Sequence, residues 1–202
     1  MTIVTSRLSV SVDGFAAGPN QSVEDPFGEG GMALSNWMLE TDQPGRAADA
    51  AVLQEANDGV GSHIMGRKMF GGGDGPWDET WTGWWGEEPP YHAPVFVLTR
   101  HPRDPLPMKG GTTFNFVTDG IESALDQARK AAGDKKVAIA GGAGTVNQYL
   151  AAGLLDEFCL HVVPITLGVG ERVFEGVGAL TLEPVRVVAS PTVTHLKYRI
   201  VR

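Results

Sequence analysis

Short apolar runs alternate with helix-like segments along most of this chain. Apolar runs bounded by Gly, Pro or polar residues predict strands at 3–12, 62–66, 94–99, 113–118 and 136–140. Helices are predicted at 34–41, 45–58 and 120–133, and in the last of these Asp119 and Glu122 form the sequence pattern of a capping box. Strands interleaved with helices are typical of an α/β protein.

The C-terminal part has a different pattern. Residues 179–191 and 192–202 are two β-rich runs joined around Pro191. They predict an antiparallel hairpin that closes a largely parallel sheet. Because no repeat, low-complexity tract or linker interrupts the chain, we expect one domain over residues 1–202.

Composition narrows the function classes. The chain has 202 residues, 42% hydrophobic and 20% charged, which is ordinary for a globular protein, and no apolar run approaches the ~20 residues of a membrane span. The N-terminus has no basic leader before an apolar core, so we expect a cytoplasmic protein without a membrane partner. The net charge of −8 gives no general attraction to nucleic acid, so any anion must be held by a local basic cluster. The single cysteine, Cys159, is interpreted as a buried small hydrophobe.

A glycine-rich turn, "GGAGT", lies between the predicted strand at 136–140 and a helix-like segment. A strand that ends in this way can expose unpaired amides at the positive end of a helix dipole, with no side chains to keep a phosphate away. The same glycines are also typical of a tight strand-to-helix turn. The sequence lacks the Gly-Lys-Ser/Thr of a P-loop, so both interpretations stay open.

Basic residues follow two other predicted strands. Arg67 and Lys68 come after one, and Thr99, Arg100 and His101 come after the next. The carboxyl ends of strands in an α/β sheet share one edge, where ligands bind. We therefore predict a local anion site at this edge of an otherwise acidic protein.

Five ordered motifs carry a family resemblance: "SVDGFAAG", "IMGRKMF", "PVFVLTR", "VAIAGGAGTVNQYL" and "LLDEFCLHVVPITLGVGERVF". Together they cover nearly the whole chain. The chain resembles the dihydrofolate-reductase-like superfamily, and within it the reductase domain of the bifunctional deaminase-reductase of riboflavin synthesis and its stand-alone bacterial relatives. The resemblance implies a three-layer α-β-α fold with a mixed, mostly parallel sheet, a homodimer, and NADPH bound across the sheet edge.

The resemblance also implies which residues bind the cofactor. It assigns the adenosine 2′-phosphate to the two basic strand ends, the pyrophosphate to the glycine-rich turn and the nicotinamide to the first loop. The implied residues are Gly66, Arg67, Lys68, Leu98, Thr99 and Arg100 for the first group, Gly142, Ala143, Gly144, Thr145 and Val146 for the second, and Ala17 for the third.

The chain departs from the family where chemistry is expected. Dihydrofolate reductases have an acid on the first helix, whereas the inward part of this helix carries Trp37, a candidate substrate contact, and folate reduction is not expected. The resemblance makes Asp13 in "SVDG" the candidate catalytic group, and the alternative is a turn-forming Asp before Gly14. No zinc-ligand pattern of the deaminase half is present, so no metal is expected.

Two further features have open interpretations. Four tryptophans crowd residues 77–85, a loop that either packs on its own domain or a dimer partner, or contacts substrate. His161 lies on a predicted strand and is interpreted as a core or interface histidine rather than a proton donor.

The predicted function is an NADPH-dependent reductase that transfers hydride to a C=N or C=O group of a small polar heterocycle, pyrimidinedione or pterin-like, or of a carbonyl compound. The proton would come from solvent or from a group such as Asp13. The alternative is a non-catalytic protein that binds NADPH as a sensor or interaction module.

Overall fold

The structure is a computed structural model, and it describes residues 2–202. The strands are β1 (Val4–Ser11), β2 (Phe15–Ala17), β3 (Val60–Gly66), β4 (Pro94–Leu98), β5 (Leu106–Pro107), β6 (Thr113–Val117), β7 (Lys136–Gly141), β8 (Glu157–Val163), β9 (Glu171–Arg172), β10 (Thr181–Ala189) and β11 (Thr194–Val201). The helices are α1 (Asn36–Leu39), α2 (Ala47–Gln54), α3 (Arg67–Phe70), α4 (Gly120–Ala132) and α5 (Ala143–Ala151), with 3-10 turns at Gly31–Ser35, Glu55–Asn57 and Lys109–Gly111.

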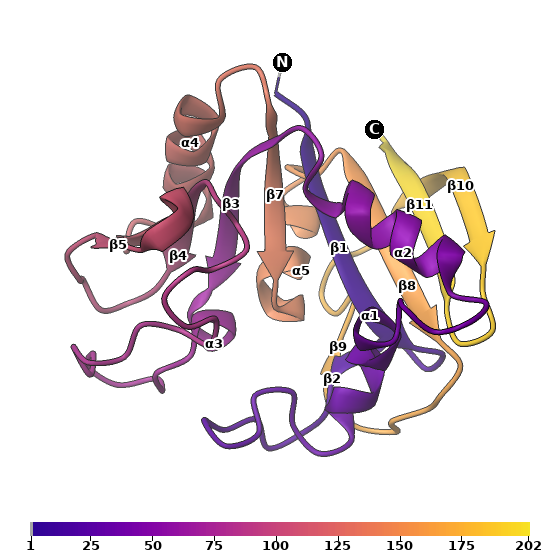
Figure 1. Cartoon of the computed structure of the whole chain (residues 1–202). Helices are drawn as coiled ribbons and strands as arrows, with labels where there is room; N and C mark the ends of the chain where they lie inside the picture. Colours follow the sequence, from indigo (N-terminus) through magenta and orange to yellow (C-terminus); the bar gives the residue numbers. More distant parts are fainter. Residues whose placement is uncertain (1) are drawn as a thin grey trace.

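A nine-stranded sheet in the order β10-β11-β8-β1-β7-β3-β4-β6-β5 forms the middle layer (Figure 1). Its six central strands, from β8 to β6, run parallel. The hairpin of β10 and β11 joins β8 in antiparallel pairing, and β5 is antiparallel at the other edge. The predicted parallel sheet with a C-terminal antiparallel hairpin is confirmed.

Helices cover both faces of this sheet. On one face, Val4 and Ile139 of β1 and β7 join the main core with Leu125 of α4 and Tyr149 of α5. Side chains alternate between faces along a strand, so the neighbours of these residues point to the other face. There the side chain of Arg7 of β1 donates to the carbonyl of Ala56, just after α2. The predicted three-layer α-β-α arrangement is confirmed.

A second apolar cluster lies on the α2 side, farther along the sheet. Met65 of β3 and Val97 of β4 are fully buried there with Phe114 of β6, and Phe70 of α3 covers them. Aromatic residues of the loop after α3 complete this layer. The second face is therefore covered in two parts, by α1 and α2 over β1, β8 and β11, and by α3 with its loop over β3, β4 and β6.

Differences from the predicted elements are local. Arg67 and Lys68 follow β3 as predicted, but they lie in a short helix, α3, that was not predicted, and the short strands β2, β5 and β9 were not predicted either. The capping box at α4 is wrong, because Asp119 makes no capping bond and its carboxylate instead accepts from the Thr118 hydroxyl at 3.3 Å. Gly120 begins the helix with a φ of 90°, which turns the chain away from the box geometry.

Candidate functional site

The carboxyl ends of β3, β4 and β7 meet at one edge of the sheet, the lower edge in Figure 1. Gly66 at the end of β3 pairs with Leu98 at the end of β4, and Met65 pairs with Gly141 at the end of β7. The three predicted cofactor-binding segments begin at these strand ends. The fold therefore brings them together where α/β proteins bind ligands.

The first turn of α5 presents backbone amides to this edge. The amides of Thr145 and Val146 donate to the Gly142 carbonyl at 3.0 and 3.1 Å, whereas those of Ala143 and Gly144 have no acceptor within residues 2–202. A Cβ built on Gly144 would meet no atom within 4 Å. Two free amides beneath open space, at the positive end of a helix dipole, fit a phosphate group. Val146 is fully buried and its amide is used, so the structure leaves no group of this residue free for a ligand.

Two other glycines of the site serve packing. A Cβ on Gly66 would lie 2.3 Å from the Thr145 hydroxyl oxygen, so β3 and α5 approach closely only because this side chain is absent. Gly141 has a φ of 131°, a conformation that L side chains rarely adopt, and its peptide bond to Gly142 is cis. The two interpretations of the glycine-rich turn thus apply to different residues. Gly141 meets a backbone requirement of the turn, and Gly144 leaves space.

The Arg67 guanidinium holds a glycine-rich loop beside the edge. It donates to the carbonyls of Gly72, Gly73 and Gly75 at 3.1, 2.8 and 3.2 Å, and its Nη1 lies 3.4 Å from the Thr99 hydroxyl. Desolvation lowers the pKa of this group from its ordinary value. Arg67 and Thr99 are thus side by side, as predicted, but most donors of the arginine already bind the protein.

An ion pair that the sequence did not predict crosses the start of α5. The Lys68 ammonium donates to a Glu171 carboxylate oxygen at 2.9 Å, and this hydrogen bond and charge raise the pKa of Lys68. The other carboxylate oxygen would lie 3.7 Å from a Cβ built on Gly142. An acid therefore lies beside the amides that fit a phosphate. The signal for it in the sequence was the adjacent acid and base after the glycines of "GVGER".

The remaining predicted cofactor residues differ in accessibility. Arg100 is exposed and Leu98 is half-buried at the edge. Ala17 ends β2 and is only 7% exposed. The backbone at Gly170 lies directly against it, since a Cβ added to Gly170 would be 2.0 Å from the Ala17 carbonyl oxygen. Ala17 thus lies at the correct edge but beneath another loop.

The Asp13 carboxylate is bonded to a backbone loop. Its two oxygens accept from the amides of Leu167 and Gly168 at 3.1 and 2.7 Å. Its hydrogen bond from Ser11 is the main cause that lowers its pKa to about 2, and the two amides add to the effect. The group is ionised at neutral pH and cannot donate a proton from that state. The turn interpretation is supported as well, since the Gly14 amide donates to the Ser11 carbonyl.

Trp37 is a core residue and not a surface open to substrate. It is 3% exposed, and its indole N–H donates to the Ser9 hydroxyl at 2.9 Å. Its ring packs against His161 and His195 at centroid distances of 4.8 and 4.9 Å. Trp37 therefore offers little surface to a ligand in this structure, because it packs against the sheet, and its contact with substrate stays a prediction.

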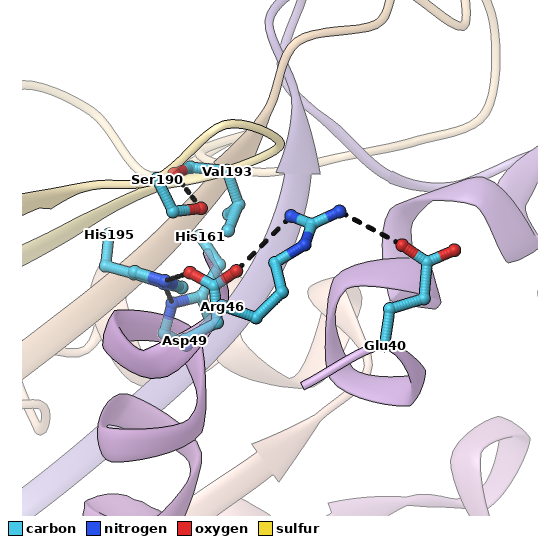
Figure 2. Close-up of polar contacts among 7 residues, drawn as sticks. All are labelled: Glu40, Arg46, Asp49, His161, Ser190, Val193 and His195. Carbon is cyan, nitrogen blue, oxygen red and sulfur yellow. Dashed lines mark hydrogen bonds and ion pairs between the residues drawn. The ribbon is translucent and has the colours of Figure 1, made fainter. Parts of the chain in front are cut away.

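These two histidines belong to a buried polar chain (Figure 2). The Nδ1 atoms of His161 and His195 are 2.8 Å apart, and Nε2 of His195 lies 3.0 Å from a carboxylate oxygen of the fully buried Asp49. The Arg46 guanidinium lies between two carboxylates: its Nη1 is 3.4 Å from the other oxygen of Asp49, and its Nη2 is 3.1 Å from an oxygen of Glu40. With both rings neutral, His195 donates to Asp49 and accepts from His161. Burial lowers the pKa of His161 to about 3, and the core interpretation of this histidine is confirmed.

The tryptophan-rich loop packs on its own chain. Trp77 lies under the Arg67 guanidinium, 3.0 Å from the ring centroid, and its indole N–H donates to the His101 carbonyl. Trp81 donates to the Phe70 carbonyl at 3.1 Å, and a Cβ at Gly72 would strike the Trp81 ring at 2.8 Å. The loop thus closes over the second apolar cluster. Self-packing, one of the two predicted alternatives, is confirmed.

A small pocket opens between this loop and the one after β2. It has a volume of about 100 Å³, and Lys68, Asp74 and Trp84 form part of its wall together with residues 21–26. It adjoins the start of α3 at the carboxyl edge.

Residues 2–202 contain no cluster of three or more His, Cys, Asp or Glu side chains that could hold a metal ion. No helix in the same range is long and apolar enough to cross a membrane.

The sequence matches the family model of the RibD C-terminal domain over residues 2–196. No curated protein sequence matches the chain. The family match covers nearly all of the chain and includes every residue of the candidate site.

Solved structures share the fold. A protein described as a riboflavin biosynthesis protein from Shewanella sp. PV-4 superposes with a TM-score of 0.64 at 20% identity, over 100% of both chains. The Thermotoga maritima diaminohydroxyphosphoribosylaminopyrimidine deaminase/5-amino-6-(5-phosphoribosylamino)uracil reductase gives a TM-score of 0.60 at 13% identity, and the match covers 99% of this chain but only 57% of that one. A riboflavin biosynthesis reductase of Saccharomyces cerevisiae gives 0.54 at 13% identity, over 100% of this chain and 89% of that one. At these identities the likeness concerns the fold.

Proposed function

The chain belongs to the RibD C-terminal domain family of reductases, and on that premise we propose that it is an NADPH-dependent oxidoreductase. Its substrate is a small polar heterocycle, pyrimidinedione or pterin-like, or a carbonyl compound, which accepts hydride at a C=N or C=O carbon. Reductases of this family use a nicotinamide cofactor; NADPH in particular is our proposal.

One observation carries the proposal. The free amides of Ala143 and Gly144 lie at the same sheet edge as Arg67 and Lys68, in a protein whose net charge is −8. A local concentration of donors and cations in an acidic protein supports an anionic ligand at that edge. Pyrophosphate and an adenosine 2′-phosphate supply the two anionic groups that such an arrangement would hold.

Different residues bind different parts of the cofactor. The α5 amides receive the pyrophosphate, and Arg67, Thr99 and Arg100 surround the 2′-phosphate. When bound, the nicotinamide supplies the hydride. Asp13 fixes the loop at Leu167 and Gly168 by its ionised carboxylate, and the proton for the product comes from solvent.

The test is NADPH consumption, followed by its absorbance, with a panel of pyrimidinediones, pterins and carbonyl compounds. We expect at least one member of the panel to be reduced, and NADPH to be preferred over NADH. Failure of both cofactors to bind would contradict the proposal at the cofactor stage. Binding without any turnover would contradict only the catalytic part.

A second candidate is a non-catalytic NADPH-binding protein. Two observations favour it: the Asp13 carboxylate is bound to the loop with a pKa of about 2, and the first helix carries the buried Trp37 where dihydrofolate reductases have an acid. This candidate predicts NADPH binding, measured by thermal stabilisation, with no substrate of the panel reduced. Reduction of any panel member excludes it.

A further inference from the structure

A second pocket, larger than the one beside the tryptophan-rich loop, lies outside the candidate cofactor site. It has a volume of about 260 Å³ and lies between the end of α2 and the sheet, over the amino-terminal halves of β1 and β8. Polar side chains form much of its wall: Arg7, Lys136, Arg186, Lys197, His161 and His195. None of the predicted cofactor residues lines it. Thr5 and Val60 mark its place at the amino ends of parallel strands, opposite to the edge described above.

Two of the four cations of this wall have carboxylate partners. Arg186 pairs with Glu55 at 2.6 Å, and Lys197 pairs with Glu157 at 2.8 Å. Within residues 2–202, Arg7 and Lys136 form no ion pair. Arg7 and Lys136 therefore have no carboxylate at ion-pair distance in this range, and the four cations of the wall outnumber its three acids, Glu55, Asp58 and Glu157.

Of these two cations, Arg7 gives the stronger indication of a bound anion. It lies on the central strand β1, and burial lowers the pKa of its guanidinium. Among the described residues it donates only to the Ala56 carbonyl, although a guanidinium has five N–H donors. Glu55, whose charge acts on Arg7, is already paired with Arg186. A largely enclosed cation with unused donors is costly unless a counter-ion reaches it.

Three of the cations also act on the one thiol of the wall. Arg7, Lys197 and Lys136 each act on the thiol of Cys159 and oppose the rise that burial causes in its pKa. In the described part of the chain, Asp58 is the one wall acid outside the two ion pairs. Apolar side chains, among them Val52 and Val188, complete the wall.

We propose that this pocket is a second binding site, for a small organic anion that carries a phosphate or carboxylate group. The oxyanion binds to Arg7 and Lys136, and the body of the ligand packs on Val52 and Val188. The pocket shares no residue with the carboxyl edge, so this proposal stands independently of the proposed reductase activity.

The single cysteine supplies a readout specific to this pocket. Cys159 is the only cysteine of the chain and lines the pocket, so its alkylation by neutral iodoacetamide, followed by intact mass, reports on this site alone. The probes are inorganic phosphate and acetate, each against sodium chloride at equal ionic strength. Because only the ligand-free form reacts, an anion at ten times its dissociation constant slows alkylation about tenfold. Protection by phosphate but not acetate indicates a phosphorylated ligand, and the reverse indicates a carboxylate.

Neighbouring lysines provide a matched pair of variants. Lys136 lines the pocket, whereas Lys135 is exposed beside it and does not. We expect Lys136→Gln to weaken the protective anion about tenfold and Lys135→Gln to leave it unchanged. Lys136 is the first residue of β7, so Lys136→Gln changes the end of a strand, whereas removal of the largely enclosed Arg7 from within β1 would risk the fold.

Three results would overturn the proposal: no protection of Cys159 by either anion, equal loss in both lysine variants, or loss of protection when NADPH saturates the protein. The last result would place the anion at the cofactor edge. Protection that persists with NADPH bound, in a protein that reduces no substrate, would support the second site and count against the reductase proposal alone.

Discussion

Lys68 and Glu171 form an ion pair at 2.9 Å across the start of α5. The carboxylate lies beside the amides proposed to bind pyrophosphate, so it repels a phosphate and occupies a cation that would attract one. We predict that Glu171→Gln tightens NADPH binding up to about fivefold, with a smaller effect at high salt. Titration calorimetry measures this change. Glu175→Gln, at an exposed acid nearby, is the control and should have no effect. Weaker binding in Glu171→Gln would mean that the ion pair orders the site.

Arg67 has two roles that a pair of variants can separate. Arg67→Ala removes the proposed 2′-phosphate ligand and also the bonds to the glycine-rich loop. Arg103 holds the same loop through the carbonyls of Trp81 and Glu79 and lies outside the predicted site. Arg103→Ala is the matched control, and both Arg67→Ala and Arg103→Ala should lower the melting temperature. Only Arg67→Ala should weaken NADPH, by about ten- to hundredfold, and leave NADH nearly unchanged. Equal loss of both cofactors would assign Arg67 to loop structure alone.

Gly144 and Gly66 are predicted to respond in opposite ways. Gly144→Val adds a side chain in open space, so the unfolding free energy of the free protein should change by less than about 1 kcal/mol. The same variant should lose the stabilisation that NADPH gives the wild type, about 2.7 kcal/mol at 100 times the dissociation constant. Gly66→Ala places a methyl group 2.3 Å from the Thr145 hydroxyl oxygen and should cost about 1–3 kcal/mol without ligand. Melting curves of each variant with and without NADPH measure both the loss of stability and the loss of cofactor binding. A Gly144→Val protein still stabilised by NADPH would remove α5 from the cofactor site.

The lowered pKa of Asp13 predicts a loss of stability in acid. Its pKa is lowered to about 2, below the ~3.9 of an unfolded aspartate. Its contribution to the unfolding free energy is therefore fully present above about pH 4 and is lost as the pH falls towards 2. Asp13→Asn should therefore melt at a lower temperature than wild type near neutral pH, and the difference should shrink between about pH 4 and pH 2. A difference that stays constant with pH would show that hydrogen-bond geometry, not the charge, stabilises the loop. The pH profile of turnover should show no step from Asp13 near neutrality.

The lowered pKa values of the buried histidines predict a second loss of stability in acid, of the same sign as that of Asp13 but at higher pH. Burial lowers the pKa of His63 to about 4 and that of His161 to about 3, while an unfolded histidine titrates near ~6.5. The unfolded chain therefore binds protons that the folded chain does not, and stability should fall as the pH drops from about 6.5 towards 4. His63→Gln should reduce the proton uptake on unfolding by about one, measured from the pH dependence of the unfolding free energy. His101→Gln, outside the core, is the matched control. An unchanged slope in His63→Gln would mean that His63 is protonated in the fold.

The element order and the ligand edge were accessible from local pattern. Apolar runs at 62–66, 94–99 and 136–140 predicted β3, β4 and β7 almost to their ends. Parallel strands must present their carboxyl ends on one edge, so the basic and glycine-rich segments that follow them had to meet. The local pattern failed for the capping box of α4 and for very short elements, such as α3, where Phe70 packs into the second apolar cluster.

What each side chain touches was decided by the tertiary structure alone. Lys68 meets Glu171 across 103 positions of sequence, and His195 meets Asp49 across 146. Trp37 was predicted as a substrate contact and is buried between β1 and the two histidines, because α1 is only one turn long and lies flat on the sheet. Hydrophobic periodicity states which face of an element is buried, but strand register and loop conformation select the partner on that face. The sequence by itself therefore determined the sheet and the edge at which the basic and glycine-rich segments meet, and only the packed chain determined which charges at that edge are free.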